Sequence, residues 1–239
     1  MDRSRPLQLD RLRFRYSPTV VGWNVDVNSL SLSSGEHILL SGSSGGGKST
    51  LLYLIAGLLD PVEGRVLVGG TDLHSMRGGT RDLYRGRNIG MIFQTFNLLH
   101  GFSAVENVMA ALMFSALPGR EHRSYAADLL AKLGIKDPDA DPDLMSVGQQ
   151  QRVAVARAVA CEPILVLADE PTASLDPELT IAAMDLIQET CRQRGAALLC
   201  TSHDPAMAQR FERRIALSEL GAHAAPAKPA LAPKSEVAR

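Results

Sequence analysis

The sequence contains few cysteines, few aromatic side chains, almost no net charge and no long apolar run. Only three cysteines occur in 239 residues. Cys161, Cys191 and Cys200 lack the short paired spacing that zinc sites and redox motifs need. We therefore expect reduced thiols, as in cytosolic proteins. A formal net charge of -1 gives no electrostatic reason to expect nucleic acid as the principal ligand.

The apolar segments are too short to suggest a membrane span. The longest, Leu51 to Leu59, falls well below the roughly 20 residues that cross a bilayer as a helix. The N-terminal segment carries charges but lacks the apolar run of a secretion signal. We expect a protein that is neither secreted nor embedded in a membrane by itself.

The hydrophobic fraction of 45% is sufficient for the core of one large α/β domain. Alternating runs at 7–14 and 25–32, and an apolar run that ends at Ser41, predict strands before the first glycine cluster. The pattern Ser103-Ala-Val-Glu106 is a capping box, and it opens a region that we predict to be strongly helical as far as Gly134.

The second half of the chain alternates strand and helix patterns. An apolar strand is predicted at 164–168, a helix from Pro177 and another strand at 196–201. This alternation favours a parallel sheet that is covered by helices on both faces. The segment 221–239 repeats alanine and proline without periodicity, which predicts a flexible tail.

A glycine-rich motif follows the strand that ends at Ser41 and precedes a predicted helix. Glycine lets successive backbone N–H groups turn toward phosphate oxygens, and a helix N-terminus adds its positive dipole end. Lys48 would reach the β- and γ-phosphates and Ser49 would bind Mg²⁺, whereas the alternative is a flexible linker that happens to contain a lysine. The motif fits G-x-x-x-x-G-K-[ST] and consists of Gly42, Ser43, Ser44, Gly45, Gly46, Gly47, Lys48, Ser49 and Thr50.

Two carboxylates end the apolar strand near residue 168. Ligands of parallel α/β sheets gather outside the carboxyl ends of the strands. Asp169 is therefore a candidate magnesium ligand, and Glu170 a candidate general base for an attacking water. A strand that ends in Asp-Glu can also be an ordinary solvated turn, but the upstream phosphate motif favours the catalytic interpretation.

Four further segments occur in the order seen in the family of ABC transporter nucleotide-binding subunits. The chain is similar to this family from about Leu7 to Leu217. Phe93-Gln94 resembles the Q-loop, whose glutamine touches the magnesium and water region and senses the membrane partner. Met145-Ser-Val-Gly-Gln149 resembles the signature motif. In the family, the signature holds the γ-phosphate that is bound to the opposite subunit, and here Ser146, Gly148 and Gln149 match it.

The signature departs from the family pattern LSGGQ at two positions. Met145 replaces leucine, and Val147 replaces the first glycine. A β-branched residue resists positive φ and narrows the approach of backbone to phosphate. We therefore expect weaker turnover or weaker dimer closure, and a binding-only switch is the interpretation that Val147 alone would support.

The resemblance also assigns three residues near the nucleotide. Ser174-Leu175-Asp176 matches the D-loop, which crosses the dimer interface, and Asp176 is also a candidate helix cap. His203 matches the switch histidine, which would contact the γ-phosphate and orient Glu170. Tyr16 lies where the family has an aromatic side chain that stacks on adenine, whereas Phe14 is one alternation away and could belong to the core.

The resemblance implies an α/β P-loop NTPase cassette with a RecA-like core, an antiparallel β subdomain and a helical subdomain at about 95–160, all within residues 1–220. It further implies ATP and Mg²⁺ as cofactors, catalytic roles for Lys48, Gln94, Glu170 and His203, and magnesium binding by Ser49, Gln94 and Asp169. Two copies would enclose two ATP molecules with C₂ symmetry. The partners would be a second copy and an integral membrane permease, not nucleic acid, on the inner face of the cell membrane.

Short segments, notably FQTFNLLHGFSAVENV and LADEPTASLD, resemble the branch of the family that releases lipoproteins or exports macrolides. This branch pairs with membrane subunits that have few spans and a large extracytoplasmic domain. The resemblance therefore implies extraction or export of lipoprotein, lipid or hydrophobic compounds. An ATPase that transmits force to a cell-envelope enzyme without transport would have the same sequence features.

Overall fold

The computed structural model describes residues 4–19, 21–173 and 175–221. One of its two sheets is antiparallel and has the strand order β2-β1-β4-β5. Strand β1 pairs with both neighbours, and its alternating buried positions explain why the sequence pattern predicts it. The strands are β1 (Leu7–Phe14), β2 (Val25–Leu32), β4 (Glu63–Val68) and β5 (Thr71–Asp72).

The second sheet is parallel and has the order β6-β7-β8-β3-β9. Its central strands β7 and β8 are buried along their whole length, as expected for a sheet with helices on both faces. Because these strands run in the same direction, their carboxyl ends meet at one edge. The strands are β3 (His37–Ser41), β6 (Ile89–Ile92), β7 (Leu165–Asp169), β8 (Ala197–Thr201) and β9 (Arg213–Ala216).

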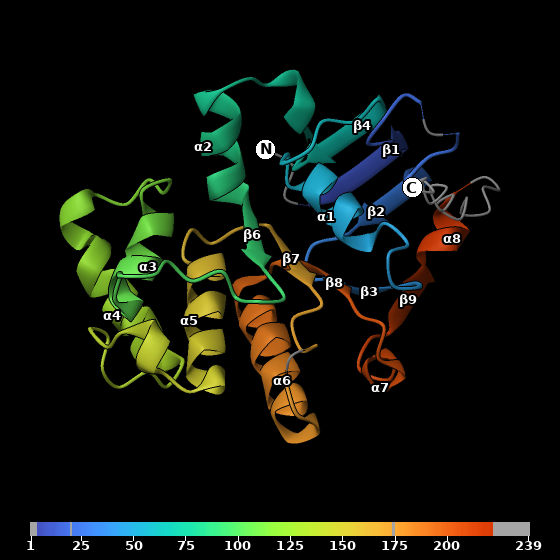
Figure 1. The fold of residues 1–239 in the computed structure, drawn as a ribbon. Coiled ribbons are helices and arrows are strands. Elements are labelled where there is room, and N and C mark those ends of the chain that lie inside the picture. Colours follow the sequence, from blue (N-terminus) through green and yellow to red (C-terminus); the bar gives the residue numbers. More distant parts are fainter. Residues whose placement is uncertain (1–3, 20, 174, 222–239) are drawn as a thin grey trace, which may run out of the picture.

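Helices α3, α4 and α5 pack on one another at the side of the parallel sheet where β6 lies, away from the antiparallel sheet (Figure 1). The α-helices are α1 (Lys48–Ile55), α2 (Gly79–Asn88), α3 (Ala104–Leu112), α4 (His122–Lys132), α5 (Val147–Val159), α6 (Pro177–Arg194), α7 (Pro205–Ala208) and α8 (Leu217–Leu220). The 3-10 turns are η1 (Leu73–Ser75), η2 (Gly119–Glu121) and η3 (Pro142–Leu144).

The region predicted to be helical from Ser103 to Gly134 consists of two helices. The capping box is present, because Ser103 and Glu106 exchange side-chain and backbone hydrogen bonds. The first helix ends at Leu112, and Pro118, which cannot continue a helix, precedes the 3-10 turn that leads into α4. The boundaries of the helical subdomain at 95 and 160 stay a prediction.

Two groups of buried apolar side chains fill the interior. One joins the parallel sheet to α3, α4, α5 and α6, and the other joins the antiparallel sheet and α1 to the opposite face of the same parallel sheet. The parallel sheet is therefore the common wall of both cores. No helix in the described ranges is long and apolar enough to cross a membrane. The predicted tail lies outside the described residues, apart from Gly221.

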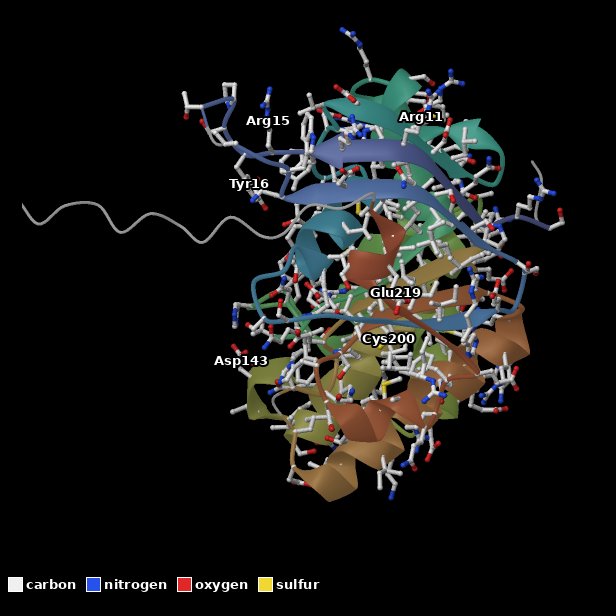
Figure 2. The ribbon with its side chains drawn as sticks, turned by 90° about the vertical axis from the view of Figure 1, so that its right-hand side faces the viewer. Arg11, Arg15, Tyr16, Asp143, Cys200 and Glu219 are labelled. Atoms are coloured by element: carbon white, nitrogen blue, oxygen red, sulfur yellow. The ribbon has the colours of Figure 1, made fainter. Side chains whose placement is uncertain are left out.

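The three cysteines are free thiols within the fold. Cys161 Sγ donates to the Ala111 carbonyl at 3.1 Å. Burial raises the pKa of Cys161 to about 11 and that of Cys191 to about 12, so both thiols are protonated at neutral pH. Cys200 lies in the buried strand β8, and Figure 2 shows it inside the sheet region.

Candidate active site

The glycine-rich loop connects the carboxyl end of β3 to the first turn of α1. Gly45 and Gly47 have φ values of 73° and 98°, which a side chain would resist. A Cβ at Gly47 would also lie 2.5 Å from the Asn24 carbonyl oxygen. No side chain caps the N-terminus of α1 in this structure. The loop therefore leaves backbone N–H groups at a helix start, which is the arrangement that binds phosphate.

Lys48, the first residue of α1, has a buried side chain that is 4% exposed. Its Nζ donates to the carbonyl oxygens of Gly42 at 3.0 Å and Ser43 at 3.1 Å. It also lies 3.5 Å from Glu170 Oε1. The ammonium group thus contacts both the glycine-rich loop and Glu170, the residue that follows β7.

Asp169, the last residue of β7, lies beside the start of α1. The residue is 5% exposed, and its Oδ1 accepts two hydrogen bonds, from Ser49 Oγ at 3.0 Å and from Thr201 Oγ1 at 2.9 Å. Two of the predicted magnesium ligands, Ser49 and Asp169, are therefore in direct contact. These are hard oxygen donors, the type that Mg²⁺ prefers.

Glu170 follows Asp169 and is held from two sides. His203 Nδ1 donates to Glu170 Oε2 at 2.9 Å, and Lys48 Nζ faces Oε1. The backbone of Glu170 has φ 44°, a left-handed conformation that a non-glycine residue adopts at a cost. The side chain is 18% exposed and the imidazole 59%. A carboxylate with this support and access to solvent can accept a proton from a water molecule.

Thr201, the last residue of β8, is a site residue that the sequence analysis missed. Its hydroxyl donates to Asp169 Oδ1 and accepts a hydrogen bond from Glu170 N at 3.0 Å. One buried hydroxyl thus binds the carboxylate of Asp169 and the backbone N–H of Glu170. The register of β7 and β8, which places Asp169 opposite Thr201, is the signal that could have found it.

We predict that Thr201→Val will lower the free energy of unfolding by about 2 kcal/mol, because it leaves the Glu170 N–H without its partner and removes one of the two hydrogen bonds to Asp169 Oδ1. The rate of ATP hydrolysis should fall by about 10-fold as Glu170 loses its support. Urea unfolding and a steady-state ATPase assay measure the two effects. Thr201→Ser is the matched control, since it keeps the hydroxyl. A serine variant as impaired as the valine variant would contradict the assigned role.

Gln94 lies in the turn after β6 and is exposed. Strand β6 pairs with β7 so that Ile92 is opposite Ala168. Gln94 and Glu170 therefore leave the sheet at the same edge, two residues beyond that pair. Among the hydrogen bonds of the described residues, none joins Gln94 to Asp169 or Glu170, so the structure does not bring Gln94 into the cluster.

Tyr16 lies at the end of β1, beside α1. Its hydroxyl is 3.0 Å from Thr50 Oγ1, although 64% of the residue is exposed. Phe14 is buried and packs edge to face against Tyr16, with the ring centroids 4.9 Å apart. Phe14 therefore belongs to the core. Tyr16 offers an exposed ring next to the phosphate loop.

The signature residues form the start of α5. Ser146 Oγ accepts from Gln149 N and Gln149 Oε1 accepts from Ser146 N, a capping box. Val147 and Gly148 are helical, and neither has positive φ. The backbone at Val147 therefore does not need the positive φ that valine would resist, whereas weaker turnover or weaker dimer closure stays a prediction. Figure 1 shows α5 well apart from α1, so the signature and the phosphate loop of one chain do not share a site.

The D-loop match is only partly described. Asp176 caps α6, because its side chain accepts from Leu179 N at 2.9 Å. This confirms the predicted cap, and the exposed side chain is compatible with a second role. Ser174 lies outside the described residues.

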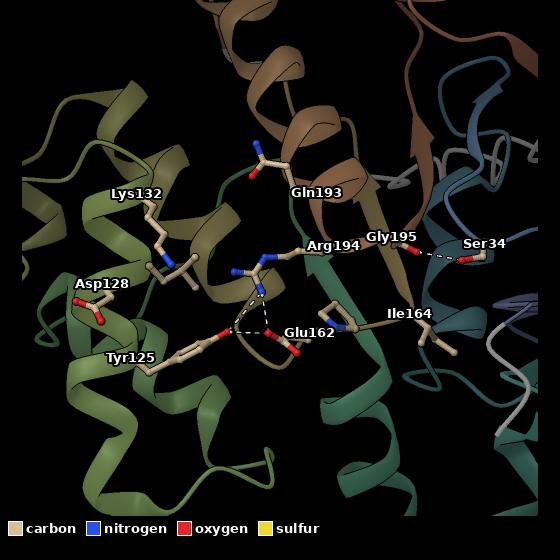
Figure 3. A pocket seen from close by; sticks show the side chains of 11 residues that line it. Ser34, Tyr125, Asp128, Lys132, Glu162, Ile164, Gln193, Arg194 and Gly195 are labelled. Atoms are coloured by element: carbon tan, nitrogen blue, oxygen red, sulfur yellow. Dashed lines mark hydrogen bonds and ion pairs between the residues drawn. The ribbon is translucent and has the colours of Figure 1, made fainter.

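A cavity of about 670 Å³ lies at the opposite end of β7, next to Ile164 and Gly195 (Figure 3). Arg194 crosses it, with Nη1 3.4 Å from the Tyr125 hydroxyl and 3.6 Å from Glu162 Oε1. The cavity contains none of the predicted site residues. The candidate active site is therefore the cluster at the carboxyl edge of the sheet.

The family model described as ABC transporter matches residues 25–173, more than half of the chain. A lipoprotein-releasing system ATP-binding protein, LolD 1 of Caulobacter vibrioides, is 40% identical over 195 residues, which cover 80% of this chain and 82% of the relative. A phosphonates import ATP-binding protein, PhnC 1 of Rhodopseudomonas palustris, is 41% identical over 198 residues, or 78% of this chain and 70% of the relative.

Solved structures agree with the sequence relatives. The dimeric post-hydrolysis structure of the ATP-binding cassette MJ0796, bound to ADP and Pi, superimposes with a TM-score of 0.77 at 32% identity. The match covers 88% of this chain and 93% of that one. The predicted α/β P-loop fold is thereby confirmed. The chain belongs to the ABC transporter ATP-binding family and is an ATP-binding ATPase subunit of a transporter.

Proposed function

We propose that this chain hydrolyses ATP in a head-to-tail homodimer beneath a membrane permease, and that it powers extraction or export of lipoprotein, lipid or hydrophobic compounds. One observation carries the catalytic part of the proposal. Lys48, Asp169 and Glu170 converge at the carboxyl edge of the parallel sheet, next to a glycine loop and an uncapped helix start.

The residues around Asp169 fit a magnesium ion. Asp169 is a buried carboxylate with two hydroxyl neighbours, Ser49 and Thr201, and its other oxygen accepts none of the hydrogen bonds found among the described residues. Ser49 and Asp169 would hold the ion, and Gln94 would reach it from the neighbouring strand end. Magnesium bound there would neutralise charge that develops on the phosphates.

The protein's own groups account for the remaining chemistry. Lys48 turns from the loop carbonyls to the β- and γ-phosphates, and the N–H groups of the loop, from Gly42 to Gly47, cradle them. Glu170 accepts a proton from the attacking water, and His203 orients its carboxylate. Tyr16 stacks on adenine through its exposed ring.

A second copy would complete each site. Ser146, Gly148 and Gln149 of one chain would face the γ-phosphate held by the other chain, and Asp176 would lie across the interface. The separation of α5 from α1 within one chain supports this arrangement, and so does the dimeric form of the related cassette that is bound to ADP and Pi. ATP then joins the subunits, and hydrolysis releases them.

The substrate class is supported by the lipoprotein-releasing relative. A phosphonate importer is equally similar in identity, so the direction of transport depends on the membrane partner. A partner with few spans and a large extracytoplasmic domain would agree with extraction, whereas a permease with many spans would favour import. Binding to either partner would place the chain on the inner face of the membrane.

A surface cavity of about 250 Å³ is the candidate contact for that partner. It lies between the turn that carries Thr95 to His100 and the loop before the signature. His100 Nδ1 lies 3.0 Å from Asp143 Oδ1, so the two sides of the cavity are joined at its rim. Figure 2 shows Asp143 at the margin of the molecule, beside the helices.

We predict that Asp143→Arg will abolish copurification of the membrane partner, because it reverses a charge at the cavity rim and breaks the contact with His100. ATP hydrolysis by the isolated chain should stay within about two-fold of wild type. The measurement is affinity purification from detergent-solubilised native membranes. Mass spectrometry identifies the recovered protein, and the sequence of that protein gives its predicted number of spans.

Asp128→Arg is the matched control. Asp128 is exposed on α4 and lies away from this cavity, so the same charge change should leave copurification intact. Recovery of the same membrane protein by all variants would contradict the proposal that this cavity contacts the membrane partner. Recovery of no integral membrane protein by wild type would contradict the transporter function.

A further inference from the structure

The side chain of Arg157, near the C-terminal end of α5, binds the turn that follows Gln94. Its Nη1 donates to the Asn97 carbonyl oxygen at 2.5 Å and its Nη2 to the Phe96 carbonyl oxygen at 2.6 Å. One guanidinium thus donates hydrogen bonds to two successive backbone carbonyls. Such charge-assisted pairs fix geometry more firmly than neutral hydrogen bonds.

The turn at residues 93–97, to which Arg157 donates these hydrogen bonds, has a strained backbone. Phe96 has φ 59° and Asn97 has φ 47°, both in the left-handed region. Asparagine tolerates this region, but phenylalanine adopts it at an energetic cost. The turn's own backbone bonds, Phe96 N to Phe93 O and Asn97 N to Thr95 O, are short-range. An external contact is therefore needed to keep the conformation.

The contact with the turn supplies the hydrogen-bond acceptors of the Arg157 guanidinium. No carboxylate in the described ranges forms an ion pair with Arg157, and burial lowers its pKa below the usual value for arginine. A partly buried cation without a counter-ion is costly. The hydrogen bonds to the two carbonyls offset the cost of burying the guanidinium, so its contact with the turn explains an arginine at this position.

Helix α5 links this turn to the signature. Arg157 lies near its C-terminal end, Ser146 caps its N-terminus, and Gln150 Nε2 donates to the carbonyls of Pro142 and Met145. The same helix therefore holds both walls of the surface cavity between the turn and η3. Because Ile92 pairs with Ala168, the turn begins at the sheet edge where Glu170 lies.

We propose that Arg157 is a positioning residue for hydrolysis: it locks the turn at residues 93–97 in its left-handed conformation and so keeps Gln94 at the sheet edge that carries Asp169 and Glu170, from which it can reach bound magnesium. The same contact makes the turn move with α5. This role rests on the proposed ATPase function. Arg157 touches neither nucleotide nor metal, and it acts through the backbone carbonyls of Phe96 and Asn97.

Arg157→Met removes the donors and keeps a long apolar side chain. Amide hydrogen exchange at residues 94–99 of the nucleotide-free protein should accelerate by about 10-fold or more. The Mg²⁺ concentration for half-maximal hydrolysis should rise about 5-fold and kcat should fall about 10-fold. ATP binding in the presence of EDTA should stay within about two-fold. Arg157→Lys, which can still reach one carbonyl, should recover most of each effect.

The matched control is Arg152→Met on the same helix. Arg152 Nη1 also donates to a carbonyl, that of Leu133 after α4, but it does not touch the turn. This variant should keep wild-type exchange at 94–99 and wild-type magnesium dependence. Equal effects of both substitutions, or a lysine variant no better than methionine, would overturn the proposal. Hydrogen exchange needs no turnover, so an inactive wild-type chain would contradict the proposed function, while the exchange rates at residues 94–99 would still show whether Arg157 holds the turn.

Discussion

Replacing Glu170 with glutamine is expected to reduce kcat for ATP hydrolysis by about 100- to 1,000-fold, the contribution typical of a general base. The carboxylate is held between His203 and Lys48 at the end of β7. Glutamine has the same shape and can still bind both neighbours, but it cannot accept the proton of the attacking water. Folding should therefore be nearly unchanged while the chemical step fails.

The same substitution should stabilise the ATP-bound dimer. Glutamine removes one negative charge that would face the γ-phosphate, so repulsion in the closed state falls. In size-exclusion chromatography with ATP and Mg²⁺, the variant should elute as a dimer under conditions where wild type, which hydrolyses its ATP, elutes mainly as a monomer. ATP affinity should be equal to or higher than that of wild type.

Glu162→Gln is the control for this experiment. Glu162 also follows an apolar segment and faces a cation, Arg194, but it lies at the other end of β7. It should keep wild-type turnover. A Glu170 variant that retains more than a tenth of wild-type activity would exclude Glu170 as the base. A wild-type chain that neither hydrolyses ATP nor dimerises would contradict the proposed function.

Short-range patterns predicted the chemistry-bearing segments well. Strands β1 and β2 begin and end where their alternation does, and the phosphate loop lies between β3 and α1 as its flanks indicate. Such features depend on neighbours within a few residues. Asp176 at the start of α6 belongs to the same class, because a cap is a local interaction.

Features that depend on contacts between distant segments were not predictable. Thr201 became a site residue only because β8 pairs with β7 in a register that places it opposite Asp169. Arg157 binds backbone carbonyls, and carbonyls carry no signature in a sequence. The strain at Glu170 is likewise a property of the folded backbone. The helical backbone at Val147 was not predictable for the same reason, since a family pattern of glycines does not reveal the conformation at that position.

Replacing Lys48 with methionine is expected to weaken ATP binding by about 10- to 100-fold, the loss that corresponds to about 1.5–3 kcal/mol for a hydrogen bond to a charged group. Methionine has a similar length and no charge. The loop carbonyls of Gly42 and Ser43 would lose a donor, but they lie at the mouth of the loop, where water can replace it. The variant should therefore fold.

The loss of Lys48 can be separated from a loss of structure. Lys48 is buried at 4% exposure, and a buried cation is costly to the folded state, so the methionine variant should melt no lower than about 3 °C below wild type. Equilibrium binding of a fluorescent ATP analogue and thermal unfolding measure the two effects on one sample. Lys132→Met, on the exposed face of α4, is the control. Unchanged affinity in the Lys48 variant would mean that the phosphates bind elsewhere, whereas lost affinity with an intact fold would place the β- and γ-phosphates beside Glu170, where hydrolysis requires them.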